Sequence, residues 1–136
     1  MSRALIQQIT EQQNYPVLDT QNYDDFVNNQ AYSVIFFGGD PKRYPETNDV
    51  IIILPELEKA FPNKFSVAVV DENSERALAK KYGFTMWPAL VFLKQGKYLD
   101  IMTRIRDWSD YMNDIPVILN KEPNYAPSIG ISVEIK

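Results

Sequence analysis

The sequence predicts an α/β fold built around a central mixed β-sheet flanked by helices. Two runs of β-branched and aromatic residues, 32–37 and 64–71, lack polar alternation, which is typical of strands buried on both faces. Residues 89–103 form a predicted hairpin that turns at Gln95-Gly96. Strands that alternate with helices pair in parallel, and the late hairpin adds antiparallel strands at one side of the sheet.

The first third of the chain is expected to contain two short helices and a strand. Apolar residues at helical spacing predict a helix that starts near the N-terminus and ends before Tyr15. A short strand is expected at residues 15–19. A second helix should cover residues 21–30, with Thr20 as its N-cap.

A longer helix is expected after residues 32–37. Its apolar stripe repeats at helical spacing and consists of Val50, Ile53, Leu54, Leu57 and Phe61. Three residues are candidate caps for its start: Thr47, Asn48 and Asp49. Pro55 should kink this helix, because proline lacks the N–H that the turn requires. Ile51 and Ile52 lie off the stripe, so we expect burial under the 40–49 loop or the C-terminal tail, or exposure as a partner or dimer surface.

Two further helices are expected in the second half of the chain. Residues 74–83 predict a short helix that Gly83 closes in the C-cap position. The last helix should cover residues 108–119, with Asp107 as its N-cap and Pro116 in its final turns.

The pattern divides the chain into a domain over residues 1–120 and a C-terminal tail over residues 121–136. Linker-like residues open the tail, and a strand pattern follows. Its alternating apolar residues are Ile129, Ile131, Val133 and Ile135. An uncovered strand of this kind is a sticky edge. We therefore expect the tail to pack on its own domain, with Ile51 and Ile52 as candidate contacts, or on a second copy, and to leave when a partner arrives. The alternative is a frayed terminus, because the entropy cost of ordering the segment is close to the gain from burying it.

The residue types present exclude several classes of chemistry. The chain contains neither Cys nor His, which removes disulfides, thiol catalysis, thiolate zinc sites and imidazole general bases. The sequence lacks the carboxylate pattern of a calcium loop, and we predict no metal and no cofactor. The net charge is −4, and Lys and Arg are scattered without a basic stripe, so nucleic acid is not an expected partner.

A cytoplasmic protein without membrane insertion is expected. Residues 1–16 lack an apolar core of signal-peptide length. The longest aliphatic run covers residues 50–54. It is far shorter than the roughly 20 residues needed to span a bilayer.

The order of elements resembles the thioredoxin fold over residues 16–119. Residues 34–39 match the strand that leads to the active site of that fold, and Pro55 matches its helix-kinking proline. Residues 67–84 match the segment before the cis-proline loop, and Pro88 stands where thioredoxins place the cis-proline. The resemblance implies a thioredoxin-like fold that keeps this loop.

The departures from thioredoxins decide the chemistry. Residues 40–49 replace the C-x-x-C motif and make the segment a few residues longer. Phe36 occupies the place of a buried acid, and Arg104 falls where thioredoxins keep a small residue beside the peptide groove. Because a thiolate is the nucleophile of disulfide exchange, redox activity is excluded.

Two segments resemble the HyaE/HupG family, cysteine-less thioredoxin-like proteins that act in the maturation of uptake nickel–iron hydrogenases. The segments are residues 38–57, GGDPKRYPETNDVIIILPEL, and residues 86–100, MWPALVFLKQGKYLD. The resemblance implies a chaperone that binds the hydrogenase small-subunit precursor through its twin-arginine signal peptide before export. A monomer or a weak homodimer is expected.

The loop around Trp87 and Pro88 is the first candidate partner-binding site, together with Met86. The thioredoxin match favours a cis Trp87-Pro88 bond. In that fold the backbone before the cis-proline pairs with an extended peptide, a form of strand addition. The alternative is that the proline only shapes a core-facing loop. Trp87 is expected either buried under the loop or exposed as an aromatic anchor.

Asp40, Glu46 and Asp49 are the second candidate set, because they are the acids nearest to the start of the long helix. One interpretation is capping and complementarity to the helix dipole. The other is that one or two of these acids meet the arginines of a basic peptide. Three cations argue against a uniformly acidic groove: Lys42, Arg43 and Arg104.

Three classes of function remain open. The first is a non-enzymatic chaperone, and the second is a redox-inactive scaffold or subunit of a larger assembly. The third, an enzyme that uses paired carboxylates, is the weakest. Its candidate acids lie at strand and helix ends, where acids commonly act as caps: Asp71, Glu72, Asp107 and Asp110. A chaperone should bind an isolated signal peptide, whereas a scaffold should require a folded partner.

Overall fold

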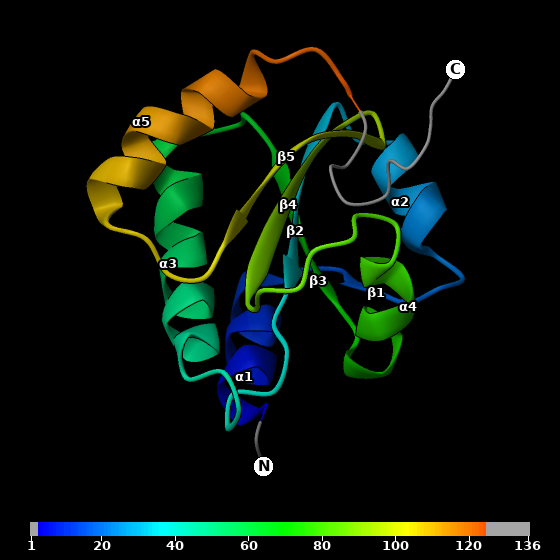
Figure 1. Ribbon diagram of the computed structural model, residues 1–136, viewed down its shortest axis with the longest axis vertical. Coiled ribbons are helices and arrows are strands. Elements are labelled where there is room, and N and C mark those ends of the chain that lie inside the picture. Colours follow the sequence, from blue (N-terminus) through cyan, green and yellow to red (C-terminus); the bar gives the residue numbers. More distant parts are fainter. Residues whose placement is uncertain (1–2, 125–136) are drawn as a thin grey trace.

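The protein folds around one five-stranded sheet with the strand order β1-β3-β2-β4-β5 (Figure 1). The structure is a computed structural model that describes residues 3–124. Its strands are β1 (Val17–Leu18), β2 (Tyr32–Phe37), β3 (Ser66–Val70), β4 (Ala89–Lys94) and β5 (Lys97–Thr103). β3 runs parallel to β1 and β2, whereas β4 is antiparallel to both β2 and β5. The predicted mixed sheet with a late hairpin is therefore confirmed.

Helices cover both faces of the sheet. In the described part of the chain they are α1 (Ala4–Gln13), α2 (Tyr23–Asn28), α3 (Glu46–Ala60), α4 (Glu75–Ala79), α5 (Trp108–Leu119) and the 3-10 helix η1 (Glu72–Ser74). Helices α1, α3 and α5 pack on one face, and α2 and α4 pack on the other (Figure 1). The sheet consequently has one hydrophobic core on each side.

Strand β2 lies at the centre of the sheet and contributes to both cores. Val34 and Phe36 belong to the core with α1, α3 and α5, while Ile35 and Phe37 belong to the core with α2 and α4. Each of these side chains is at most 1% exposed. The unbroken apolar run arises because β2 has strands on both edges and helices on both faces. Phe36, at the place where thioredoxins keep an acid, is an ordinary core residue.

Helix α3 starts at Glu46, one residue before the first predicted cap. Pro45 occupies the N-cap position with a φ of −58°, which suits the first turn of a helix. Thr47 is fully buried, and its hydroxyl donates a hydrogen bond of 2.6 Å to the carbonyl oxygen of Gly38. The predicted cap is therefore wrong, because the Thr47 side chain binds the end of β2 rather than its own helix.

The two isoleucines off the predicted stripe of α3 differ in exposure. Ile51 is fully buried in the core shared with α1 and α5, whereas Ile52 is 50% exposed. Three helices pack on this face of the sheet, so α3 needs a wide apolar side, and Ile51 completes it. Ile52 is thus exposed in the structure, and its use as a partner or dimer surface stays a prediction. Pro55 lies inside α3, as predicted.

The predicted cap of α2 is also wrong. The helix starts at Tyr23, with Asn22 in the N-cap position, and Thr20 lies in the preceding turn. The carboxylate of Asp19 accepts hydrogen bonds from the N–H groups of Gln21 and Asn22, each at 2.9 Å. A local side-chain acceptor therefore does organise this turn, but it is Asp19.

The remaining helix boundaries follow the sequence more closely. Helix α5 starts directly after Asp107, although this side chain makes no capping hydrogen bond within residues 3–124. Helix α4 is shorter than predicted and ends at Ala79. Gly83 nevertheless closes the segment, because it has a φ of +65° and its N–H donates to the carbonyl oxygen of Ala79 at 2.9 Å.

The hairpin between β4 and β5 turns where the sequence predicted. Gln95 and Gly96 have φ values of +49° and +79°, the left-handed conformation that a two-residue hairpin turn requires. A Cβ on Gly96 would meet the Oδ1 atom of Asn28, which a rotation of that side chain could relieve, so the positive φ is the main reason for glycine at this position.

The predicted strand of the tail lies outside the described residues. The last described residue, Asn124, donates its backbone N–H to the carbonyl oxygen of Tyr98 in β5 at 2.8 Å. Within residues 3–124, the helices are too short or too polar to cross a membrane.

Candidate functional site

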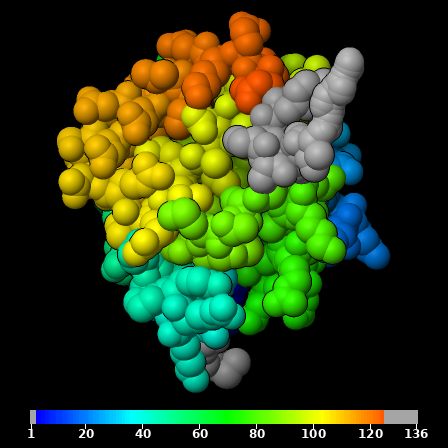
Figure 2. Space-filling model, in the orientation of Figure 1, coloured from blue at the N-terminus to red at the C-terminus, as the bar shows by residue number. Residues whose placement is uncertain are grey.

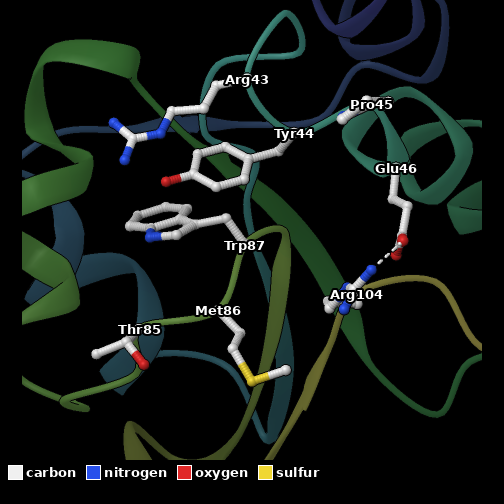
Figure 3. Close-up of a pocket in the computed structure, with 8 residues that line it drawn as sticks. All are labelled: Arg43, Tyr44, Pro45, Glu46, Thr85, Met86, Trp87 and Arg104. Atoms are coloured by element: carbon white, nitrogen blue, oxygen red, sulfur yellow. Dashed lines mark hydrogen bonds and ion pairs between the residues drawn. The ribbon is translucent and has the colours of Figure 1, made fainter.

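A groove lies at the end of the sheet where the C-terminal end of β2 leads into α3. The loop before β4 and the residue after β5 reach the same place (Figure 1). The groove has a volume of about 290 Å³ (Figure 3). Its lining consists of Arg43, Tyr44, Pro45, Glu46, Thr85, Met86, Trp87 and Arg104. On the molecular surface, the cyan loop before α3 lies beside the yellow-green loop before β4 (Figure 2).

Trp87 forms the aromatic floor of this groove. Its ring packs edge-to-face on Phe84 and Phe37, with centroid distances of 4.9 and 6.3 Å. On the other side, Tyr44 stacks over it at 6.4 Å with an interplanar angle of 28° (Figure 3). Trp87 is therefore partly buried, and its exposure lies between the two alternatives that the sequence left open. Because Trp87 lines the groove, part of its surface is accessible to a ligand there.

Gly39 allows this stacking. A Cβ at this position would lie 3.0 Å from Cδ2 of Tyr44 and 3.3 Å from Cβ of Trp87. The residue also has a φ of +72°, which disfavours any side chain. The glycine pair after β2 thus permits the 40–45 loop to fold over Trp87.

The peptide bond between Trp87 and Pro88 is cis. Pro88 is buried beneath the groove and does not line it, but its carbonyl oxygen accepts the backbone N–H of Arg104 at 2.7 Å. Met86 is 49% exposed beside Trp87. Two of the three residues predicted in this loop, Met86 and Trp87, therefore line the groove, and Pro88 supports it.

Glu46 and Arg104 form an ion pair at one end of the groove. The Nη2 atom of Arg104 donates to Oε2 of Glu46 at 2.6 Å (Figure 3). The backbone N–H of Ile105 donates to Oε1 of Glu46 at 2.8 Å. The hydrogen bond from Arg104, followed by that from Ile105, lowers the pKa of Glu46 below its usual value. The same hydrogen bond with Glu46 raises the pKa of Arg104. Glu46 therefore stays ionised near neutral pH.

The other two predicted acids lie elsewhere. Asp40 accepts the N–H of Lys42 with its side chain at 3.0 Å and the N–H of Tyr44 with its carbonyl oxygen at 2.7 Å, so it shapes the loop. It lines a neighbouring cavity of about 370 Å³, which shares Tyr44 and Trp87 with the groove. Asp49 is exposed in the first turn of α3 and is outside the groove lining. Of the three acids, the structure places Glu46 in the groove.

Sequence reasoning missed the residues that fix the glycine pair, Arg3 and Glu75. The Glu75 side chain is buried, and its Oε2 atom accepts the N–H of Gly38 at 2.7 Å and that of Gly39 at 3.2 Å. Arg3 donates to the same oxygen at 3.2 Å and to the carbonyl oxygen of Gly39 at 2.9 Å. The two charged residues lie 72 positions apart in the sequence, so no local pattern connects them.

Burial has the largest effect on the ionisation of Glu75. It raises the pKa of this carboxyl, and the charge of Arg3 and the two glycine N–H groups offset part of the rise. The hydrogen bonds of Glu75 to Gly38, Gly39 and Arg3, and that of Arg3 to Gly39, all lie at the end of β2, next to the base of the groove. Glu75 and Arg3 therefore hold the base of the 40–45 loop without touching the groove itself.

The described residues offer little to a metal ion. Within residues 3–124, acidic side chains never gather in a group of three or more that could hold one. The whole sequence lacks Cys and His, so thiol and imidazole chemistry have no residues to perform them. The arrangement consists instead of aromatic and apolar surface, including the half-exposed Met86, and three charged groups: those of Arg43, Glu46 and Arg104.

Comparisons with known proteins identify the family. The family model described as "Hydrogenase-1 expression protein HyaE" matches residues 5–111. The chain belongs to the HyaE family. The hydrogenase expression/formation protein HoxO of Azotobacter vinelandii is 44% identical over 131 residues, which cover 96% of this chain and 88% of that protein. HyaE-family membership gives this chain a role in hydrogenase maturation.

Other members and solved structures agree with this assignment. The hydrogenase expression/formation protein HupG of Rhizobium leguminosarum bv. viciae is 34% identical and covers 99% of this chain and 94% of that protein. The crystal structure of HupG from Rhodopseudomonas palustris is 34% identical, with a TM-score of 0.55 over 76% of this chain and 94% of that chain. A Plasmodium falciparum thioredoxin matches at 14% identity, with a TM-score of 0.56 over 76% of this chain and 95% of that chain. The HyaE-family member thus has the thioredoxin-like fold, without its cysteines.

Proposed function

We propose that this protein is a cytoplasmic chaperone of hydrogenase maturation that binds the small-subunit precursor through its twin-arginine signal peptide. The relatives are named hydrogenase expression/formation proteins, which supports an accessory role. The observation that carries the proposal is the groove beside Trp87 and Pro88. It combines an aromatic floor, a half-exposed Met86 and one ionised carboxylate at its end.

The groove suits an extended peptide with both apolar and basic residues. Apolar side chains would pack on Tyr44, Met86 and Trp87, where large flexible and aromatic residues make adaptable contacts. Backbone groups of the peptide would pair with the backbone of residues 85–87, as in strand addition. A guanidinium group would face Glu46. Asp40 and Asp49 contribute at most through the long-range field around this end of the molecule.

The proposal includes no catalysis. Disulfide exchange requires a thiolate, and the chain contains no cysteine. We expect the pure protein to leave the disulfides of insulin intact at the rate of a blank without protein. Reduction above that blank would contradict a purely binding role.

Titration of an isolated twin-arginine signal peptide into the pure protein tests the proposed function. We expect binding, and protection of residues 86–90 from hydrogen–deuterium exchange when the peptide is present. Trp87→Ala should weaken binding at least about tenfold, as loss of an aromatic anchor usually does. Trp108→Ala is the matched control, because Trp108 lies in α5 outside the groove lining and is 46% exposed. Absence of binding, or protection only elsewhere, would refute the assignment.

A scaffold or subunit of a larger assembly is the second candidate. The observation in its favour is apolar surface outside the groove, since Trp108 and Val117 of α5 are 46% and 61% exposed. A scaffold should ignore the isolated peptide and bind a folded hydrogenase subunit. Pull-down of the precursor with and without its signal sequence separates the two functions. Size-exclusion chromatography of the free protein, which we expect to elute as a monomer or weak homodimer, gives the baseline.

A further inference from the structure

Arg104 has a backbone conformation that its side chain does not favour. Its φ is +62°, in the left-handed region where glycine is the preferred residue. The backbone N–H donates to Pro88, a bond that any residue other than proline would make. Glycine would therefore satisfy this turn with less strain. Strained non-glycine residues are concentrated at functional sites, which directs attention to the Arg104 side chain.

The side chain of Arg104 reaches into the groove and ends on Glu46 (Figure 3). Its side chain is 55% exposed, and that of Glu46 is 28% exposed. An exposed ion pair of this kind contributes little to folding, because water and salt screen it. The ion pair between Arg104 and Glu46 can therefore open at little cost in free energy. Neither the backbone conformation nor the stability of the fold requires an arginine at position 104.

Glu46 does not depend on Arg104 for its position. It lies in the first turn of α3, and the backbone N–H of Ile105 holds its Oε1 atom at 2.8 Å. Oε2 is the oxygen that receives Arg104. If the arginine side chain moved away, the carboxylate would remain oriented, with one oxygen open to a new donor. This is a preorganised acceptor for a guanidinium group.

The charges of the groove oppose a basic ligand as long as Arg104 stays in place. Within the described residues that line it, the guanidinium groups of Arg43 and Arg104 stand against the single carboxylate of Glu46. Arg43 lies over the ring of Tyr44, 5.5 Å from its centroid. A peptide arginine that entered this space would meet excess positive charge. Removal of Arg104 from the groove would leave one cation and one anion.

We propose that Glu46 is the binding site for one arginine side chain of the peptide, and that Arg104 occupies this site in the free protein. The inference rests on the proposed function and specifies how the peptide is recognised. The incoming guanidinium replaces Arg104 on Oε2 of Glu46, while Ile105 continues to hold Oε1. One charged hydrogen bond is exchanged for another, and the displaced side chain turns into solvent. Selectivity then arises because a ligand must offer a guanidinium to displace one.

The test compares four variants with the wild-type protein, using a twin-arginine signal peptide as the probe. Arg104→Gly suits the backbone conformation and should fold normally, and it should bind the peptide about two- to fivefold more tightly at low salt. Arg104→Gln keeps the side-chain stem and the strain, and should also bind more tightly. Glu46→Gln should bind less tightly. Lys64→Gln is the control for net charge, because Lys64 is exposed beyond the opposite end of α3 and should leave the affinity unchanged.

A double-mutant cycle makes the test specific. In the Glu46→Gln background, Arg104→Gly should increase affinity less than it does in the wild-type background, because the acceptor for the peptide arginine is lost and only the repulsion by the Arg104 cation is relieved. The gain should vanish for a peptide whose two arginines are replaced by glutamine. Equal or weaker binding by Arg104→Gly, with the wild-type protein binding the peptide, would overturn the inference and leave the proposed function intact. Absence of binding by the wild-type protein would refute the proposed function itself.

Discussion

Two arginine–glutamate pairs flank the loop between β2 and α3, and they differ in surroundings rather than in chemistry. Arg3 and Glu75 meet at 3.2 Å with side chains only 15% and 8% exposed. Arg104 and Glu46 meet at the shorter distance of 2.6 Å, with side chains 55% and 28% exposed. The buried pair also binds the backbone of Gly38 and Gly39, whereas the exposed carboxylate binds one backbone N–H.

The comparison shows that distance does not rank these pairs. A partner removed from the buried pair leaves a charge and several backbone groups without compensation in the interior. Water can replace either partner in the exposed pair. Glu75 and Arg3 thus fix the architecture behind the groove, while Glu46 and Arg104 are free to exchange partners in front of it.

The largest expected effect is the loss of the buried carboxylate. Glu75→Ala should lower the free energy of unfolding by about 3–5 kcal/mol, because Arg3 keeps only its carbonyl partners and loses its counter-charge, and two glycine N–H groups lose their acceptor. Chemical denaturation measures this change. Glu72→Ala, an exposed acid in the neighbouring 3-10 helix, is the control and should change the free energy by less than about 0.5 kcal/mol. If Glu75→Ala and Glu72→Ala both changed the free energy of unfolding only slightly, the buried Arg3–Glu75 pair would not stabilise the fold more than an exposed acid does.

The pH dependence of stability should have opposite signs for the two glutamates. Burial raises the pKa of Glu75, so the folded state binds more protons than the unfolded state above the ordinary value of 4.5. The contribution of Glu75 is present below that value and is lost as the pH rises through its higher folded pKa. The hydrogen bond from Arg104 lowers the pKa of Glu46, so its contribution is present above 4.5 and is lost as the pH falls through the lower folded pKa.

Thermal unfolding at a series of pH values separates the two contributions. Glu75→Gln should flatten the stability profile above pH 4.5, and Glu46→Gln should flatten it below that value, by a smaller amount because this carboxylate is exposed. If both variants changed the same side of the profile, the contrast between burial and hydrogen bonding would be wrong.

A smaller effect is expected from relief of backbone strain at Arg104. Arg104→Gly should leave the melting temperature unchanged or raise it by a few degrees, because glycine accepts a φ of +62° and the lost ion pair is exposed. Arg104→Ala is the matched variant, since it keeps the strain and loses the same ion pair. A clear drop in melting temperature for the glycine variant would show that the exposed pair stabilises the fold.

The smallest expected effect is that of salt. A rise in ionic strength to 1 M shortens the screening length to roughly 3 Å and should reduce the stability difference between Glu46→Gln and wild type. The difference between Glu75→Gln and wild type should persist, because the interior excludes the salt. If salt reduced the stability differences of Glu46→Gln and Glu75→Gln by the same amount, the two ion pairs would be equally exposed to solvent, and the contrast between them would be wrong.

The elements of the fold were predictable because their signals are local. The apolar run at residues 32–37, the spacing along α3 and the Gln95-Gly96 turn each carry their pattern within a few neighbours. Helix starts were less predictable. Thr47 and Thr20 are good caps by residue type, but tertiary packing buries Thr47, and the neighbouring Asp19 organises the turn that holds Thr20.

The site was predictable only in part, for the same physical reason. Met86 and Trp87 were found because the fold resemblance fixes their loop. Asp40 and Asp49 were selected because they are close in sequence to the start of α3. In the structure, Asp40 belongs to the loop before α3 and lines the neighbouring cavity, and Asp49 lies in the first turn of α3, outside the groove lining. Glu75 gave no signal, because its partners come from α1 and the end of β2. Long-range charge pairing cannot be read from one sequence.

The stacking of Tyr44 on Trp87 gives the protein a built-in optical probe. The chain has two tryptophans, and the other, Trp108, is 46% exposed in α5. In a Trp108→Phe background, the tryptophan fluorescence would come from the groove floor alone, next to the ring of Tyr44 and the cation of Arg43. A ligand that parts this stack must shift the emission and change its quenching by acrylamide. Ligand binding in the groove can therefore be measured by intrinsic tryptophan fluorescence, in solution and without a label.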